Sequence, residues 1–574
     1  MYLFAEIRML PVLILMLVWA AAGWLIAARF FDLPRHERGL LGLGLGLVVS
    51  NWLANLLARV LPLPLAFWAA AALALVLGVS AALPIRRELR SMLPLEWGEW
   101  LALAALAFFL TLIGRGLAIF DDYQNLPILS RLAAGDIPPH FPFDSDLRLG
   151  YHYFLLLLAA QFMRVGQAAP WVALDAARGL TSALALLLLG QLAFRLTGKP
   201  VARFAAVVFG AFAGGARWIL VLLPPSVLSQ VASRVQLIGV STATSTDLAD
   251  FLLRSWQIDG SGPVPFPTAF ISGVDSPFVM ALSGAGTGAR MVVLLLFLLG
   301  TRVKAKMAWP VLGVLLASLA LLNEPEFVVL WLGLTAAIAL QWVRSRSLRV
   351  AGELGPWIGA LALTAFLVLV QGGMFTELAR GLVLGGTSQA SYFEVGFHPV
   401  WPPTVVSSHL GYLSLLDPYQ LLVAGLEFGP VILVFPLVLV WGWRALREER
   451  WLEAGLALSG VLGVLMVFFQ YSGNAGPTAT TRLYGGFSLV CWMLAVPLTW
   501  RLVEAKREAV QVTALVIGCV SMLSGVVLLS VQLFAAYHPV PSYFLNDRTR
   551  ACRSDGGTPC RPRRWSSIRC PAER

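Results

Sequence analysis

Charged residues and cysteines are both scarce in this 574-residue chain. Only 13% of the residues are Asp, Glu, Lys or Arg, whereas 58% are hydrophobic, and the mean hydropathy is +0.77. A soluble domain could not bury so much apolar surface. The composition therefore excludes a soluble globular protein and predicts a polytopic membrane protein.

The five cysteines do not form a recognisable framework. Cys491 and Cys519 lie inside apolar runs, where a small apolar side chain is the simplest interpretation. Cys552, Cys560 and Cys570 crowd the last stretch at spacings that match no zinc motif. We therefore predict no disulfide framework, redox centre or zinc site.

Nucleotide-binding motifs are also missing, since the chain has neither a P-loop nor a Gly-rich turn after a strand. This excludes an ATP-driven machine built from this chain alone. The net charge of +11 does not indicate nucleic acid, because the Lys and Arg residues lie in short loops between apolar runs.

Long apolar runs dominate the rest of the chain, and most are near the length of ~20 residues that a bilayer requires. Because backbone polar groups in lipid must be satisfied internally, the predicted fold is an all-α integral membrane bundle of about fourteen spans. We expect it in the cell (inner or plasma) membrane. The runs are 10–28, 39–58, 64–83, 98–119, 171–194, 201–223, 289–303, 307–322, 327–342, 354–371, 428–445, 453–470, 483–500 and 511–534.

Basic loops alternate along this series and predict the topology, because cytoplasmic loops carry an excess of Lys and Arg. The alternation holds if the sixteen apolar residues 150–165 form a helix in or dipping into the outer interface instead of a span. All the long loops, 120–149, 224–288 and 372–427, are then extracytoplasmic. The basic loops centre on residues 29–38, 86–90, 195–203, 302–306, 344–349, 444–450 and 501–507.

The first outer loop, 120–149, concentrates the polar residues that could perform chemistry. Asp121 and Asp122 follow the 98–119 run, with Arg115 shortly before them. A carboxylate at the lipid boundary, held ionised by a nearby guanidinium, can take a proton from an acceptor or orient it. Acidic residues facing water at a helix end are the alternative interpretation.

Asp144-Ser145-Asp146 could hold a divalent cation such as Mg²⁺ or Mn²⁺ against a diphosphate, with His140 as a further ligand. A solvated turn is an equally simple interpretation of this triplet. Four arginines, Arg115, Arg217, Arg290 and Arg482, lie at predicted outer helix ends, where they could bind a lipid phosphate or snorkel to headgroups.

Several islands of sequence resemble the GT-C fold membrane glycosyltransferases. Pro138-Pro139, Asp144 and Tyr151-His152-Tyr153 are similar to the Pro-Pro, Asp and triple-tyrosine signature of one bacterial and archaeal branch. Residues 322–327, with Glu326 in the acidic position, and 480–484, with Arg482, resemble two later elements. The sequence departs from that branch in two ways: His152 replaces the middle tyrosine, and an expected Asp-x-His motif is absent before residue 289.

The resemblance implies transfer of a sugar from a polyprenyl-phosphate carrier to an extracytoplasmic glycan, lipid or protein acceptor. Asp121 or Asp122 would be catalytic. Arg115, Arg482, Tyr151, His152, Tyr153 and Glu326 would bind the substrate or its phosphate. A transporter or lipid flippase, and a non-catalytic membrane scaffold, stay open as alternatives. The other partners expected are membrane lipids, not nucleic acid.

The end of the chain differs sharply from the rest. Residues 1–537 are predicted to form the membrane domain. Residues 538–574, rich in Arg, Cys, Ser, Pro and Gly, have no apolar periodicity and are predicted to be disordered. An out-of-frame gene end would also produce such a composition.

Overall fold

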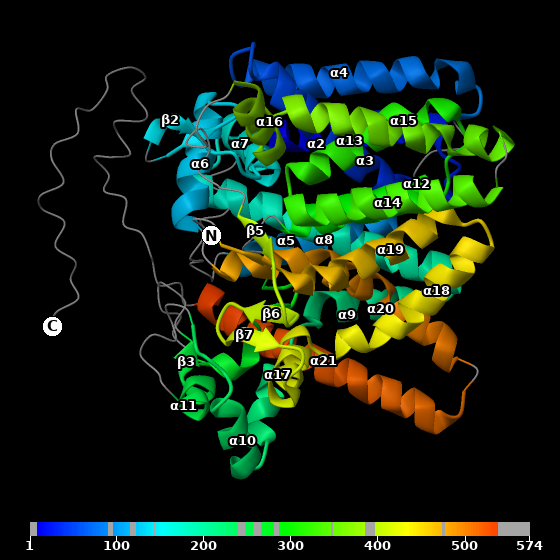
Figure 1. Cartoon of the computed structure of the whole chain (residues 1–574). Helices are drawn as coiled ribbons and strands as arrows, with labels where there is room; N and C mark the ends of the chain where they lie inside the picture. Colours follow the sequence, from blue (N-terminus) through cyan, green and yellow to red (C-terminus); the bar gives the residue numbers. More distant parts are fainter. Residues whose placement is uncertain are drawn as a thin grey trace, which may run out of the picture.

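A computed structural model of the chain is almost entirely helical (Figure 1). It describes residues 8–89, 96–114, 122–142, 144–238, 247–256, 266–280, 286–345, 348–384, 396–472, 477–504 and 506–537. The predicted tail, 538–574, lies outside the described residues.

The helices run roughly side by side along the bundle (Figure 1). In the first half they are α2 (Met9–Phe30), α3 (Arg35–Leu57), α4 (Leu65–Ala82), α5 (Trp97–Gly114), α6 (Asp122–Ala134), α7 (Phe154–Gly166), α8 (Pro170–Thr197), α9 (Pro200–Phe212), α10 (Pro225–Ala232) and α11 (Leu248–Leu253). In the second half they are α12 (Gly286–Gly300), α13 (Trp309–Ala320), α14 (Glu324–Ser345), α15 (Leu348–Val370), α16 (Met374–Leu384), α17 (Pro418–Phe428), α18 (Phe435–Arg447), α19 (Trp451–Leu465), α20 (Gly485–Val503) and α21 (Glu508–Tyr537).

The helices confirm a membrane-embedded, mostly helical protein. Within the described part of the chain, ten helices are long and apolar enough to cross a membrane, or eleven if the bent pair α15 and α16 is one span. The predicted runs near 201, 289 and 307 correspond to the shorter helices α9, α12 and α13. All fourteen predicted runs therefore contain a helix, but not all of these helices have spanning length.

Two predicted segments differ from expectation. The run 201–223 is not one helix, because α9 ends at Phe212 and an extended stretch leads to a 3-10 turn at Arg217–Leu222. The segment 150–165 contains the predicted helix, α7, but most of α7 is buried against protein. The first residue of α7 is held by Asn51 of α3, whose Nδ2 donates to the Phe154 carbonyl at 2.9 Å.

The basic loops meet at one end of the bundle, here called the basic end (residues 29–38, 195–203, 302–306, 344 and 446–450, and 501–504). Side chains of one basic loop contact residues of another, so these loops lie on the same face of the bundle, as the positive-inside pattern predicts. The contacts are Arg195 Nε to Glu37 Oε1 (2.9 Å), Arg203 Nη2 to Glu99 Oε1 (2.7 Å), Lys304 Nζ to the Ala28 carbonyl (2.7 Å), Lys199 Nζ to Glu504 Oε1 (2.8 Å) and Arg344 Nη1 to the Leu446 carbonyl (3.0 Å).

The long loops gather at the opposite end, on the left of Figure 1, here called the loop end. Four two-stranded antiparallel sheets form there among the described residues. They pair β1 (His140–Phe141) with β2 (Asp144–Arg148), β3 (Ser255–Trp256) with β4 (Phe266–Pro267), β5 (Phe397–Pro399) with β8 (Phe469–Tyr471), and β6 (Thr404–Ser407) with β7 (Gly411–Ser414). The sequence segments predicted to share one face therefore do share one end.

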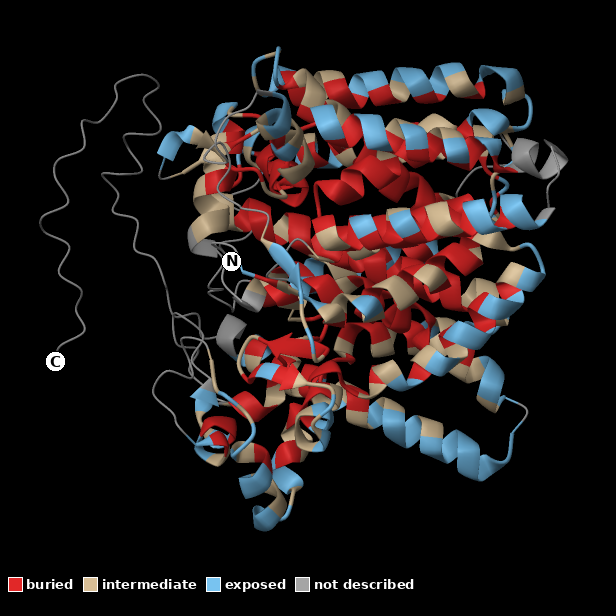
Figure 2. Ribbon diagram, viewed as in Figure 1, coloured by how far each residue is buried: buried red, intermediate tan, exposed pale blue. Residues whose placement is uncertain are grey.

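Burial divides the helices into a centre and a rim (Figure 2). In the most apolar 18-residue stretch of α8, 94% of the residues are buried, whereas the corresponding stretch of α21 is 22% buried and apolar on its exposed face. An exposed apolar helix suits lipid, so α4 and α21 form the rim and α8 the core.

Candidate functional site

A stack of side chains runs from the surface of the loop end to a buried carboxylate. The guanidinium of Arg482 is exposed and lies 5.2 Å from the centre of the Tyr151 ring. The Tyr151 and His152 rings are 3.5 Å apart, and His152 Nδ1 is 3.1 Å from Glu324 Oε2. We call these four residues, Arg482, Tyr151, His152 and Glu324, the loop-end stack.

The first turn of α14 supplies the buried end of this stack. Asn323 caps the helix by accepting the backbone N–H of Glu326 at 3.2 Å. The two glutamates are 5% and 6% exposed. Among the described residues, Glu324 Oε1 and Glu326 Oε2 have no hydrogen-bond partner. A buried carboxylate oxygen without a donor is costly, and such groups concentrate where a ligand or proton is handled.

Arg290 supplies positive charge beside these acids. Its guanidinium lies beside the stacked rings of Phe278 (5.1 Å) and Trp492 (4.9 Å) and interacts electrostatically with both Asp275 and Glu326. Burial raises the pKa of Asp275 to about 6, although Arg290 opposes the rise. Arg290 therefore stabilises buried acids, whereas Arg482 keeps an accessible guanidinium.

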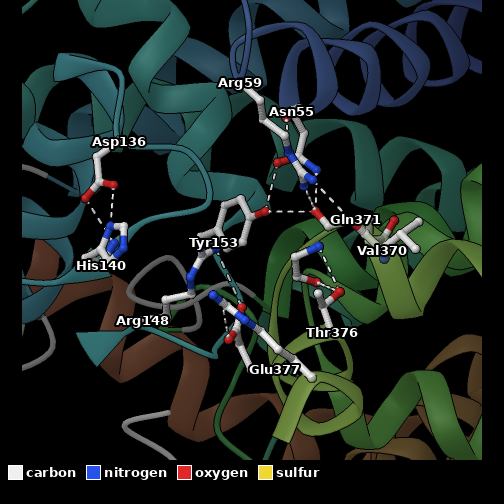
Figure 3. A network of polar contacts seen from close by, with 12 residues as sticks. Asn55, Arg59, Asp136, His140, Arg148, Tyr153, Val370, Gln371, Thr376 and Glu377 are labelled. Atoms are coloured by element: carbon white, nitrogen blue, oxygen red, sulfur yellow. Dashed lines mark hydrogen bonds and ion pairs between the residues drawn. The ribbon is translucent and has the colours of Figure 1, made fainter. Parts of the chain in front are cut away.

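Tyr153 points toward Asn55 and Gln371 and serves a different contact (Figure 3). Its ring is buried, and its hydroxyl lies 2.8 Å from Asn55 Oδ1 and 3.2 Å from the Gln371 carbonyl oxygen. Burial raises the pKa of this hydroxyl, so Tyr153 stays neutral. The described geometry gives it the structural task of holding α3 against the end of α15.

That end of α15 is a sharp break. The axes of α15 and α16 differ by 71°, and the chain turns at Gly372 and Gly373, whose φ angles of 97° and 79° favour glycine. Arg59 donates to the carbonyls of Val370, at 3.0 Å, and Gln371. The carbonyls of Val370 and Gln371 at the break are thus occupied within the protein.

A second polar cluster, Arg217 with Glu427, is fully buried. Arg217 Nε and Nη2 donate to the two carboxylate oxygens of Glu427 at 2.6 and 2.9 Å, and Ser407 Oγ donates to the same carboxylate at 2.6 Å. Burial opposes ionisation of Glu427, but the Arg217 charge outweighs it and holds the pKa below its usual range. Arg217, predicted as a phosphate ligand, is therefore committed to an internal ion pair.

The predicted metal ligands do not converge. His140 Nδ1 is 2.6 Å from Asp136 Oδ1, whereas Asp144 and Asp146 lie exposed on β2, where the Asp146 N–H donates to Asp144 Oδ1 at 3.0 Å. In the described ranges no group of three His, Cys, Asp or Glu side chains could hold a metal. A divalent cation at this triplet therefore stays a prediction from the sequence.

The remaining predicted residues lie at the limit of the description. Arg115 and Asp121 fall outside the described residues, and Asp122 begins α6 with its side chain undescribed. Just inside the bundle, Gly114 of α5 lies against Asp175 of α8, and Arg178 Nη1 is 3.9 Å from Asp175 Oδ1. Asp175 and Arg178 were not predicted as site residues, although two charges within the 171–194 run were the available signal.

Comparison with known proteins leaves the family open. No protein-family model matches the chain, and no curated protein matches its sequence. The resemblance to GT-C glycosyltransferases therefore stays a prediction made from the islands of sequence described above.

Proposed function

We propose that this protein transfers a sugar from a polyprenyl-phosphate carrier to an acceptor at the loop end of the bundle. The observation that carries the proposal is the loop-end stack. It joins an exposed guanidinium to a buried carboxylate, and its residues Tyr151 and His152 directly follow the polar loop 120–149 in the sequence. Its residues come from three separate islands that resemble one enzyme branch, and tertiary contacts bring these islands together.

The chemistry requires a charge acceptor and a proton acceptor. The acceptor oxygen attacks the anomeric carbon, the bond from that carbon to the phosphate oxygen breaks, and the carrier leaves as polyprenyl phosphate. Arg482 is exposed and can donate two hydrogen bonds to the leaving phosphate. Tyr151 beneath it limits the directions in which the guanidinium can move.

Two candidates could receive the acceptor's proton. Asp121 or Asp122 is the candidate from sequence, as a base or as the group that orients the acceptor. His152 is the candidate from the described structure, because Glu324 contacts its Nδ1 and a carboxylate–imidazole pair orients the ring.

One observation favours the transporter alternative, namely the sharp bend between α15 and α16. Transporters bind ions at the free carbonyls and helix ends of such breaks. Here the break is at the loop end, and the Gln371 carbonyl accepts hydrogen bonds from Arg59 and Asn55. With that carbonyl occupied, the break does not favour ion transport over glycosyl transfer.

Aspartate-to-asparagine variants test the catalytic assignment. If Asp121 or Asp122 is the base, its Asn variant should lower transfer by roughly 10²- to 10⁴-fold, because Asn keeps the size of Asp and loses its basicity. The neighbouring variant should be milder, since adjacent side chains point in different directions. His152→Gln in the same assay tests the second candidate.

The assay uses purified protein with a panel of polyprenyl-phosphate sugars, together with mass spectrometry of surface glycans in a deletion strain. Donor binding serves as the control for folding. Normal transfer by all three variants would place the base elsewhere. A wild-type protein that transfers no sugar from any donor, with an unchanged glycan profile in the deletion strain, would overturn the proposed function in favour of a scaffold.

A further inference from the structure

The helix α16 has the features of a helix that lies along a membrane surface. It turns 71° from α15, which is an apolar helix of spanning length, and so it runs nearly across the bundle axis. Figure 1 places it at the outer edge of the loop end, near α4 and α15. If α15 crosses the membrane, α16 lies at the level where headgroups meet acyl chains.

One side of α16 is apolar and uncovered. Leu378, Leu382 and Val383 are 44%, 79% and 82% exposed. At the start of the helix, by contrast, Phe375 packs edge-to-face on Phe327 with ring centres 5.4 Å apart. The helix is therefore anchored at its beginning and presents its last turns outward. We call Leu378, Leu382 and Val383 the apolar stripe.

The other side of α16 carries an excess of positive charge. Glu377 is buried, with its side chain 3% exposed, and Arg148 of β2 and Arg380 approach its two carboxylate oxygens at 3.8 and 3.3 Å. Both guanidiniums are about a third or more exposed, at 33% and 42%. Figure 3 shows Arg148 reaching Glu377 from a separate part of the chain. Two guanidiniums thus share one carboxylate and leave a net charge of +1.

We infer that Arg148, Glu377 and Arg380 form a binding site for the phosphate of an anionic phospholipid of the surrounding bilayer, with its acyl chains against the apolar stripe. A phosphodiester carries one negative charge, which neutralises the excess charge of this trio. Each guanidinium has five N–H donors, and the carboxylate can occupy only some of them. The stripe supplies the apolar contact that free phosphate could not use.

The occupant is a bulk phospholipid instead of the proposed sugar donor because of where the site lies. The stripe is exposed on α16, and the trio Arg148, Glu377 and Arg380 shares no residue with the loop-end stack, at which the proposed donor phosphate would bind. The inference therefore does not depend on glycosyl transfer. It would hold equally for a transporter or a scaffold with this fold.

Fluorescence quenching by brominated lipids tests the site. A bimane label at Leu382→Cys, in the full chain with its five native cysteines replaced, is reconstituted in vesicles that contain brominated phosphatidylglycerol or brominated phosphatidylcholine. We expect brominated phosphatidylglycerol to reach half-maximal quenching at a mole fraction roughly ten-fold lower, as one charge-assisted interaction would produce.

The variant that removes the site must not leave a buried charge unpaired. The triple change R148Q/E377Q/R380Q removes both guanidiniums and the carboxylate together, and it should make the two lipids quench equally while the label stays in the bilayer. Arg234→Gln is the control, because Arg234 is an exposed arginine paired with Asp417 away from α16. It should keep the ten-fold preference.

Three results would overturn the inference. Equal quenching of the unaltered site by both lipids would show that no headgroup is selected. Absence of quenching by either lipid would show that α16 does not lie in the bilayer. Displacement of brominated phosphatidylglycerol by equimolar polyprenyl phosphate would assign the site to the proposed carrier instead.

Discussion

Removal of the Glu427 carboxylate should open the outer loops without unfolding the bundle. Glu427 and Arg217 are 0% and 1% exposed, and the carboxylate accepts hydrogen bonds from Arg217, Ser407 and the Gly273 N–H. These partners belong to three different outer segments. The carboxylate is thus the common contact that holds the segments together.

The expected magnitude follows from the burial. Glu427→Gln keeps the shape of the side chain but leaves the Arg217 charge buried without its counter-ion, and breaking such a pair costs about 3–5 kcal/mol. In contrast, R217L/E427L removes both charges and should cost less than either single change to leucine. This non-additivity distinguishes an electrostatic cost from a loss of packing.

Native-state proteolysis measures the effect. Arg234 is exposed in the outer loops, and cleavage after it should require local opening, so the cleavage rate follows the population of the open form. Glu427→Gln should accelerate this cleavage roughly 10²- to 10⁴-fold. A change below about three-fold, with normal insertion in the membrane, would refute the role assigned to the pair.

Three further predictions rest on other contacts. Arg482→Ala should weaken binding of the lipid-phosphate donor about ten-fold or more. Arg290→Ala should instead lower thermal stability and leave the donor affinity of the folded protein unchanged. Equal and marginal losses of donor affinity in both variants would show that neither arginine binds the phosphate. Burial and then Arg217 lower the pKa of His409 to about 3 from 6.5, so the folded loops lose stability as the pH falls from 6.5 towards 3. The loss should be about 1–2 kcal/mol by pH 5 and should vanish in His409→Gln, as thermal unfolding at several pH values would measure. An impermeant thiol reagent should label Ser145→Cys in intact cells, and protection until lysis would reverse the proposed orientation.

The sequence by itself determined the class of protein and its two ends. Apolar runs of spanning length require helices, since lipid supplies no partners for the backbone, and each of the fourteen runs does contain one. The alternation of basic loops also predicted which loops would meet. Lys304 at Ala28 and Arg195 at Glu37 confirm that these loops share one end. These features depend on local composition, so they can be read without tertiary contacts.

Only the tertiary structure decided which polar side chains are available. Arg217, Arg290 and Arg482 look alike in the sequence, since each lies at a predicted helix end. In the fold, Glu427 neutralises the first, the second lies half-buried beside aromatic rings and buried acids, and the third stays exposed over Tyr151. Tyr151 and Tyr153, two residues apart, likewise serve the stack and the α15 break. The role of each side chain depends on partners that are distant in the sequence, and a local sequence pattern does not reveal those partners.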